Sequence, residues 1–142
     1  MRLRRTVTVR KPVHKVFAYL SDFTTTTQWN PGTVKTVRTT GNGSVRTEYQ
    51  NCSKFAGRET ELTYVVQELV PNFRIALRGE NSTVIAYDTM TFREAGGQTE
   101  VTYTVDLTFK GVTKVLALLM RPAFARLCDQ GAAGMAAALD RL

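Results

Sequence analysis

The sequence has only one histidine and two cysteines among its 142 residues. Structural and catalytic zinc sites need three or four clustered ligands, and Cys52 and Cys128 lie far apart with no paired spacing. We therefore expect no transition-metal site and no cofactor, and two reduced thiols in preference to a disulfide. A phosphate-binding loop, a dinucleotide-binding glycine pattern and a nucleophile elbow are also missing. A Ser-His-acid triad is not credible either, because His14 falls off the apolar stripe of its segment and is expected to face solvent.

Long apolar stretches are missing as well. Residues 1–6 carry charges with no apolar run behind them, so we expect no signal peptide. No stretch approaches the ~20 apolar residues that a membrane-spanning helix needs, since Lys114 and Arg121 interrupt the best candidate. The chain is predicted to be a cytoplasmic protein.

The composition fits one globular domain covering residues 1–142, with 43% hydrophobic and 22% charged residues. Lys and Arg total 19 against 12 Asp and Glu, which gives a formal net charge of +7. This excess indicates either ordinary surface solvation or an acidic partner such as RNA, a ribosome or an anionic membrane.

Alternating apolar and polar residues predict a first strand over residues 2–10. Helical spacing predicts a short helix from Pro12 to Leu20, and Ser21-Asp22 can cap a second short helix that leads to Trp29. Turn residues, including Ala56-Gly57, then separate segments rich in Thr and other β-branched residues. These segments predict antiparallel strands over residues 34–40, 44–54, 58–69, 73–80, 83–94 and 98–109.

Helical periodicity returns after Gly111 for roughly thirty residues, and Pro122 is expected to kink or split this helix after Met120. The glycines at 131 and 134 predict close packing or a bend. One stripe of the helix comprises Leu116, Met120, Ala123, Leu127, Gly131, Gly134 and Ala138. The element order predicts an α+β fold in which the sheet wraps around the long helix. It leaves open whether the enclosed space is a cavity or a dry core.

Four segments carry a resemblance to a known family. Residues 11–20 (KPVHKVFAYL) resemble its P-x-x-V-F-x-x-L helix, and residues 22–32 (DFTTTTQWNPG) its D-x-x-x-x-x-W-x-P segment. Residues 66–75 (VQELVPNFRI) and 91–101 (TFREAGGQTEV) resemble two of its strand turns. The chain thus resembles the START-like superfamily, specifically the bacterial polyketide cyclase/dehydrase group.

The resemblance implies the helix-grip (Bet v 1-like) fold, a curved antiparallel sheet of about seven strands around a long C-terminal helix, with two short helices after the first strand. It also implies a cavity beneath that helix. Similar proteins bind lipids, sterols, quinones, polyketides or plant hormones there; some are aromatases or cyclases, others are carriers, and one branch acts on ribosomes. The fold alone does not decide among these activities.

Asp88 is the candidate for acid/base chemistry, because it shares a strand face with Ala86, Met90 and Phe92. If that face points inward, as the resemblance implies, burial raises the pKa of the carboxyl group, which could act as an acid/base or anchor a ligand. Pairing with an arginine, or a position at a wet cavity mouth, is the alternative.

A tyrosine that points inward offers apolar area together with a hydroxyl group that can bond a ligand. The apolar stripe of the long helix suits the lid of a cavity. Both patterns also fit a dry core in which the tyrosine hydroxyls bond to neighbouring protein groups. Trp29 is expected to pack the short helices against the sheet. The predicted ligand-binding residues are Tyr49, Tyr64, Leu77, Asp88, Met90, Tyr103, Leu116, Met120, Phe124 and Leu127.

The leading hypothesis is binding of a small hydrophobic ligand, lipid-, polyketide- or quinone-like, by a monomer or homodimer. One alternative is a polyketide cyclase or dehydratase that uses Asp88 and a cavity tyrosine. The other is a ribosome- or RNA-associated factor, for which basic residues are expected to gather near the first strand, namely Arg2, Arg4, Arg10, Lys11, Lys35 and Arg38. Outward strand positions are mostly Thr, without the stacking aromatics that favour RNA.

Overall fold

A computed structural model describes residues 1–55, 57–111 and 113–142. Its seven strands form one antiparallel sheet with the order β1-β7-β6-β5-β4-β3-β2. The strands are β1 (Arg2–Val9), β2 (Thr33–Thr40), β3 (Glu48–Phe55), β4 (Arg58–Val70), β5 (Arg74–Glu80), β6 (Val84–Ala95) and β7 (Gln98–Phe109). The helices are α1 (Val13–Ser21), the 3-10 turn η1 (Phe23–Thr25), α2 (Thr26–Trp29), α3 (Thr113–Leu119) and α4 (Arg121–Asp140).

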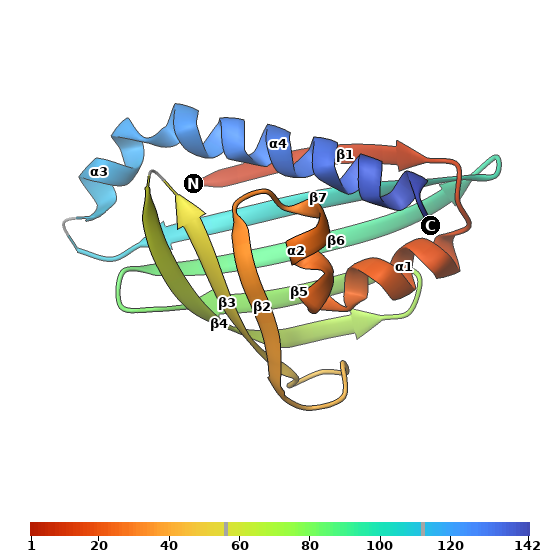
Figure 1. Cartoon of the computed structure of the whole chain (residues 1–142), viewed down its shortest axis with the longest axis horizontal. Helices are drawn as coiled ribbons and strands as arrows, with labels where there is room; N and C mark the ends of the chain where they lie inside the picture. The colour runs from red at the N-terminus through yellow and green to blue at the C-terminus, as the bar shows by residue number, and fades with distance from the viewer. Residues whose placement is uncertain (56, 112) are drawn as a thin grey trace.

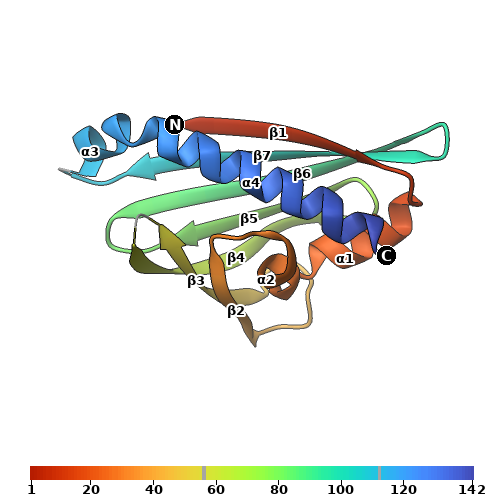
Figure 2. The same cartoon turned by 45° about the horizontal axis from the view of Figure 1, so that its top comes forward.

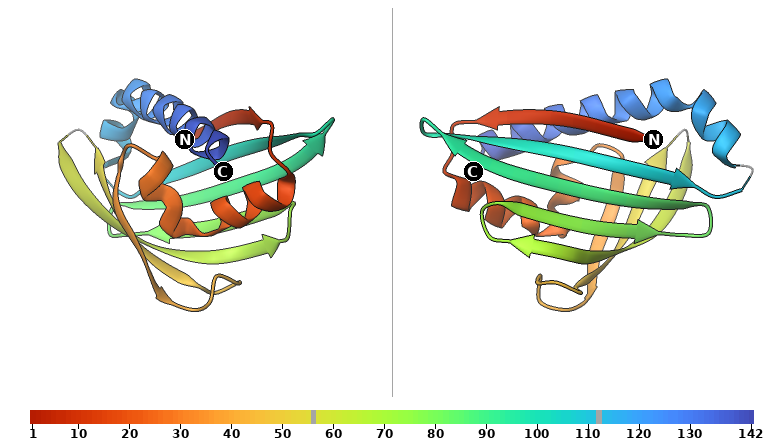
Figure 3. Two further views of the ribbon diagram at one scale, coloured as in Figure 1. Left: turned by 45° about the vertical axis from the view of Figure 1, so that its right-hand side comes forward. Right: turned by 180° about the vertical axis from the view of Figure 1, so that it is seen from behind.

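The sheet curls so that β4, β3 and β2 turn toward the viewer in Figure 1, and α4 runs across its concave side. Figure 2 shows the same helix crossing the strands diagonally, with α1 and α2 beside its C-terminal half. In the part of the chain that the structure describes, no helix lies on the opposite side of the sheet (Figure 3, right). The predicted α+β helix-grip fold, with two short helices after the first strand, is therefore confirmed.

Predicted and observed strand limits agree within two residues except at one end of β3, which begins at Glu48 instead of residue 44. The chain before it adopts left-handed backbone at Gly43 (φ 101°) and at Arg46 (φ 76°), which no strand accommodates. In the next predicted turn, Ala56 lies outside the described residues.

The predicted interruption of the C-terminal helix is confirmed. The helix breaks at Met120 (φ −94°, ψ 4°), just before Pro122; Val112, ahead of α3, lies outside the described residues. The predicted stripe is wrong at Ala123, which is exposed. Seven residues correspond to nearly two helical turns, so Phe124, not Ala123, shares the inward face with the buried Gly131.

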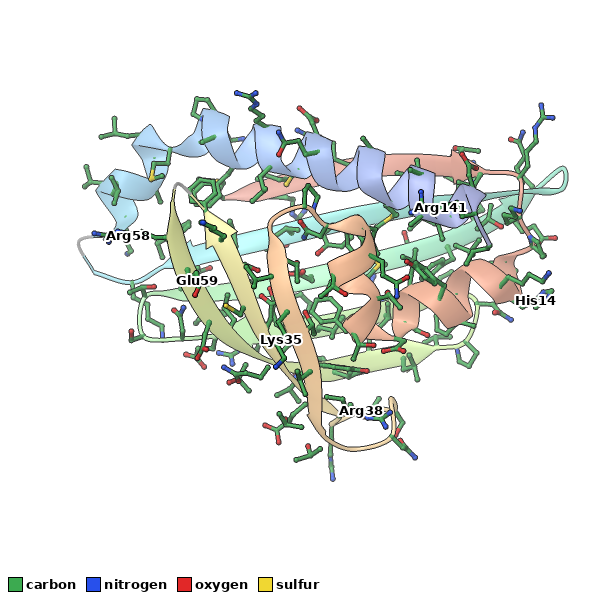
Figure 4. The ribbon with its side chains drawn as sticks, viewed as in Figure 1. His14, Lys35, Arg38, Arg58, Glu59 and Arg141 are labelled. Carbon is green, nitrogen blue, oxygen red and sulfur yellow. The ribbon has the colours of Figure 1, made fainter. Side chains whose placement is uncertain are left out.

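The basic residues gather near the first strand only in part: Arg2 and Arg4 lie on β1, and Arg10 and Lys11 directly follow it, but Lys35 and Arg38 do not. β1 and β2 form opposite edges of the sheet, so Lys35 and Arg38 lie far from Arg2 and Arg4. Figure 4 shows both β2 side chains on that edge, and His14 exposed on the outside of α1 as predicted. The basic surface expected for an RNA partner is therefore limited to the residues on and directly after β1.

Candidate functional site

A cavity of about 410 Å³ lies between the concave side of the sheet and the helices α3 and α4. Apolar side chains from β1, β4, β6, β7 and α4 form most of its wall, among them Val7, Leu62, Ala86, Leu107 and Leu127. The volume falls within the range of about 300–1,000 Å³ that is typical of small-molecule sites. The space that the sequence left undecided is thus a cavity.

Burial distinguishes the two ends of this cavity. Near α2 the lining residues Trp29 and Asp88 are each 4% exposed, so this end is closed. Near α3 the lining residues Arg58 and Thr83 are exposed, and Leu116 is 56% exposed. Figure 4 shows Arg58 at this end, below α3. The cavity therefore opens beside α3, and Asp88 lies at its far end.

Strand alternation places Asp88 in the cavity. Every second residue of β6 from Val84 to Phe92 is buried, so Asp88 shares the inward face with Ala86 and Met90. On the neighbouring β7, Tyr103 points to the same side and its hydroxyl donates a hydrogen bond to Asp88 Oδ2. The partner of Asp88 is therefore a tyrosine, not an arginine, and the carboxyl group lies at the closed end, not at a wet mouth.

Burial raises the pKa of Asp88 to about 7, because a charged carboxylate loses its hydration there. The hydrogen bond from Tyr103 acts in the opposite direction, since it stabilises the ionised form. Burial also raises the pKa values of Tyr64 and Tyr103, and the nearby Asp88 charge adds to both shifts. Near neutral pH both protonation states of Asp88 are populated, which suits it to donate or accept a proton.

Two buried side-chain atoms at the closed end have no hydrogen-bond partner among the described residues: Trp29 Nε1 and Asp88 Oδ1. The indole ring of Trp29 meets Tyr103 edge-on, with ring centroids 5.8 Å apart. An unsatisfied buried polar group costs about 1–3 kcal/mol, so an unpartnered donor and an unpartnered acceptor on two lining residues that both contact Tyr103 are notable in a mostly apolar cavity.

Sequence reasoning found the packing role of Trp29 but missed its place in the cavity wall. It also missed Cys128 of α4, which lines the cavity and whose pKa is raised mainly by burial. Helical periodicity predicts that such residues face inward. It cannot distinguish an inward side chain that touches protein from one that borders a void.

The structure brings most of the predicted ligand-binding residues into one place. The cavity is lined by Tyr64, Asp88, Tyr103, Leu116, Met120, Phe124 and Leu127. It does not include Leu77 and Met90, which are fully buried in the core, or Tyr49. Tyr49 packs on the ring of Phe23, with centroids 5.7 Å apart, and borders a separate polar hollow.

These three placements were wrong for one reason. The inward face of the sheet is longer than the cavity, and α1, η1 and α2 cover the remainder. An inward-facing strand residue in that part packs against these short helices instead of bordering the void.

The described residues hold no cluster of three or more His, Cys, Asp or Glu side chains that could bind a metal ion. Within the same residues, no helix is both long and apolar enough to cross a membrane.

The family model described as "Polyketide cyclase / dehydrase and lipid transport" matches residues 1–140. No curated protein matches the sequence. Among solved structures, the Zhui aromatase/cyclase from Streptomyces sp. R1128 is similar with a TM-score of 0.85 and 16% identity, covering 99% of this chain and 94% of that one.

Two further structures are similar over nearly their whole length. A START superfamily protein from Mycobacterium smegmatis has a TM-score of 0.70 and 17% identity, covering 98% of this chain and 94% of that one. Ara h 8.0201 has a TM-score of 0.60 and 12% identity, covering 95% and 97%. At such identities the likeness establishes the fold, and the activity must be argued from the cavity.

Proposed function

The chain belongs to the polyketide cyclase / dehydrase and lipid transport family, and we propose that it binds one small hydrophobic molecule in the cavity beneath α4. The ligand class is a lipid-, polyketide- or quinone-like molecule with an apolar body and a polar end. Apolar lining favours the body by removing its surface from water, and the few polar groups fix its orientation.

The observation that supports this proposal is the pair of unpartnered polar atoms at the closed end. Trp29 Nε1–H can donate to a ligand oxygen, and Asp88 Oδ1 can accept from a hydroxyl or, when protonated, donate to a carbonyl. A ligand that enters polar end first satisfies both atoms and leaves its apolar part against the wall near α3.

Gly131 offers a way to fill the cavity without disturbing its frame. It lines the cavity, and a Cβ added there meets no atom within 4 Å. Gly131→Leu should therefore place a side chain in the void and weaken binding of a hydrophobic probe such as an anilinonaphthalene sulfonate by about tenfold or more. Binding is measured through the fluorescence of Trp29, the sole tryptophan, which lies at the closed end.

Ala133→Leu is the matched control, because Ala133 lies on the exposed side of the same helix. It should bind the probe as the unaltered chain does. Equal binding by the Gly131→Leu variant, with its fold intact by circular dichroism, would show that the probe does not occupy this cavity. Native mass spectrometry of the purified chain tests independently for a co-purifying hydrophobic molecule.

A second candidate function, cyclisation or dehydration of a bound polyketide, is favoured by the hydrogen-bonded pair Asp88 and Tyr103. An ionised Asp88 would remove a proton from a carbon next to a ketone, and the resulting enolate carbon would attack a second carbonyl carbon of the same molecule. The new alkoxide would take the proton back from Asp88, with Tyr103 hydrogen-bonded nearby. Subsequent loss of that hydroxyl with a neighbouring hydrogen releases water.

The test of this second function is turnover of a poly-β-ketone substrate. Asp88→Asn should lower kcat by about a hundredfold or more, because an amide cannot take up the proton. Tyr103→Phe keeps the carboxyl group and should shift the pH dependence of kcat instead. Unchanged turnover by the Asp88→Asn variant would rule out the acid/base role of Asp88. It would not contradict the proposal that the cavity binds a hydrophobic ligand.

A further inference from the structure

The helix α3 exposes a continuous apolar surface at the open end of the cavity. Val115, Leu118 and Leu119 are 70%, 71% and 74% exposed, although each is a large aliphatic residue. The spacing i, i+3, i+4 puts them on one side of the helix, while Ala117 is buried on the other. We call these three residues the α3 apolar face. Such a contiguous apolar surface marks an interaction site.

Positive charge accompanies the α3 apolar face. Residues 107–128 contain two lysines and two arginines but no acidic residue. Lys114 and Arg121, both exposed, lie directly before and after the apolar residues. Lys110 bonds to Glu80, and the exposed Arg58 lies on the neighbouring rim of the cavity. The partner of this surface must therefore combine an apolar layer with negative charge.

A second copy of this chain does not meet that description. A two-fold contact through the α3 apolar face would bring Lys114 and Arg121 against their own copies, with no acidic residue in the segment to offset the repulsion. The helix has seven residues, or about 10 Å of length. Three side chains on it bury far less than the roughly 800 Å² per partner of a stable protein interface.

We propose that α3 docks this chain on an anionic lipid bilayer. Val115, Leu118 and Leu119 enter the boundary between head groups and acyl chains, and Lys114, Arg121 and Arg58 lie against the anionic head groups. Short apolar segments with flanking cations bind bilayers in this manner without crossing them. The rest of the molecule stays outside the bilayer.

Docking in this orientation brings the open end of the cavity close to the bilayer, because Leu116, Ala117 and Met120 on the other side of α3 line the cavity at that end. α3 lies between Gly111, with a φ of 60°, and the helix break at Met120. If the cavity binds a lipid-like ligand, as proposed above, the ligand passes between bilayer and cavity beside α3. This last step depends on the proposed function; the docking itself does not.

The experiment is flotation of the purified chain with phosphatidylcholine vesicles that contain or lack phosphatidylglycerol. The chain should float with the anionic vesicles, and added salt should release it, since screening weakens the electrostatic attraction. The double variant Leu118→Asp/Leu119→Asp should bind at least about tenfold more weakly. Lys114→Glu/Arg121→Glu should lose binding to anionic vesicles to a similar extent.

Matched controls carry the same changes elsewhere. Val70→Asp/Phe73→Asp alters apolar residues that are 44% and 58% exposed at the opposite end of the sheet, and Lys35→Glu/Arg38→Glu alters the β2 edge. Both controls should float as the unaltered chain does. Failure of the unaltered chain to float, or equal flotation of the α3 variants, overturns the proposal.

A third result would also overturn it: a dimer in analytical ultracentrifugation that Leu118→Asp/Leu119→Asp dissociates would show that a second copy covers α3. The Gly131→Leu variant separates the two proposals. This variant should no longer bind the hydrophobic probe but should still bind vesicles. If the proposed ligand binding is wrong, the vesicle result can therefore still be interpreted.

Discussion

The free energy of unfolding is expected to fall by about 3 kcal/mol between pH 4 and pH 7 through Asp88 alone. The pKa of this carboxyl group is raised from 3.8 to about 7 in the folded chain, and each unit corresponds to about 1.4 kcal/mol. Between these values the folded chain holds a proton that the unfolded chain has released. The contribution is therefore complete below about pH 4 and is lost as the pH rises through about 7.

Chemical denaturation of the unaltered chain and of Asp88→Asn across this pH range measures the effect. The Asp88→Asn change itself alters the free energy of unfolding by an amount that does not depend on pH. The informative quantity is therefore how the difference in free energy of unfolding between the two chains changes with pH. Glu80, whose pKa is lowered chiefly by the hydrogen bond from Lys110, contributes in the opposite direction but equally in both chains. Parallel pH profiles for the two chains would contradict a buried, protonated Asp88.

Tyr103→Phe refines the same measurement. The hydroxyl of Tyr103 donates to Asp88 Oδ2 and thereby lowers the pKa that burial raises. Its removal should move the midpoint of the pH profile upward. A midpoint that stays in place would mean that the two side chains are not hydrogen-bonded in solution.

Gly134→Ala is expected to lower the free energy of unfolding by about 3 kcal/mol, the upper part of the usual range for overpacking. A Cβ at this position would lie 2.0 Å from the carbonyl oxygen of Trp29 and 3.0 Å from its carbonyl carbon. Both atoms belong to the backbone of α2, which cannot rotate away as a side chain can. α4 would have to shift relative to α2, and the closed end of the cavity would shift with it.

Gly131→Ala is the matched control one turn earlier in α4. An added Cβ meets nothing within 4 Å there, so the variant should gain up to about 1 kcal/mol from the better helix propensity of alanine. Urea unfolding followed by the fluorescence of Trp29 gives both values. Similar stabilities of the two alanine variants would show that α4 does not approach α2 as closely as the structure indicates.

The sequence predicted the secondary structure well where the signal is local. Alternation on β6 placed Ala86, Asp88, Met90 and Phe92 on one face, the resemblance implied that this face points inward, and all four residues are buried. Pro122 predicted the interruption at Met120, because proline cannot continue a helix without losing a hydrogen bond. Close packing or a bend was predicted at the glycines 131 and 134, and close packing is found at Gly134, against Trp29, but not at Gly131.

The sequence did less well with properties that depend on distant segments. Lys35 was expected near Arg2 and Arg4. The residues of a single strand do not determine its place in the sheet, and the observed strand order puts Lys35 and these arginines at opposite edges. Met90 faces inward as predicted but does not line the cavity, and it is fully buried in the core instead.

The low number of histidines and cysteines gave no reason to expect a transition-metal site or a catalytic triad. Periodicity determined which residues share a face, and the family resemblance indicated which face points inward. Only the tertiary structure decided what the inward residues meet. The distance between α4 and the sheet depends on contacts between remote segments, such as the stacking of Phe55 on Phe124 at 4.4 Å near the open end and the approach of Gly134 to Trp29 near the closed end. Those contacts hold the helix off the sheet, and Asp88 therefore lines a cavity of about 410 Å³ instead of being enclosed by core side chains.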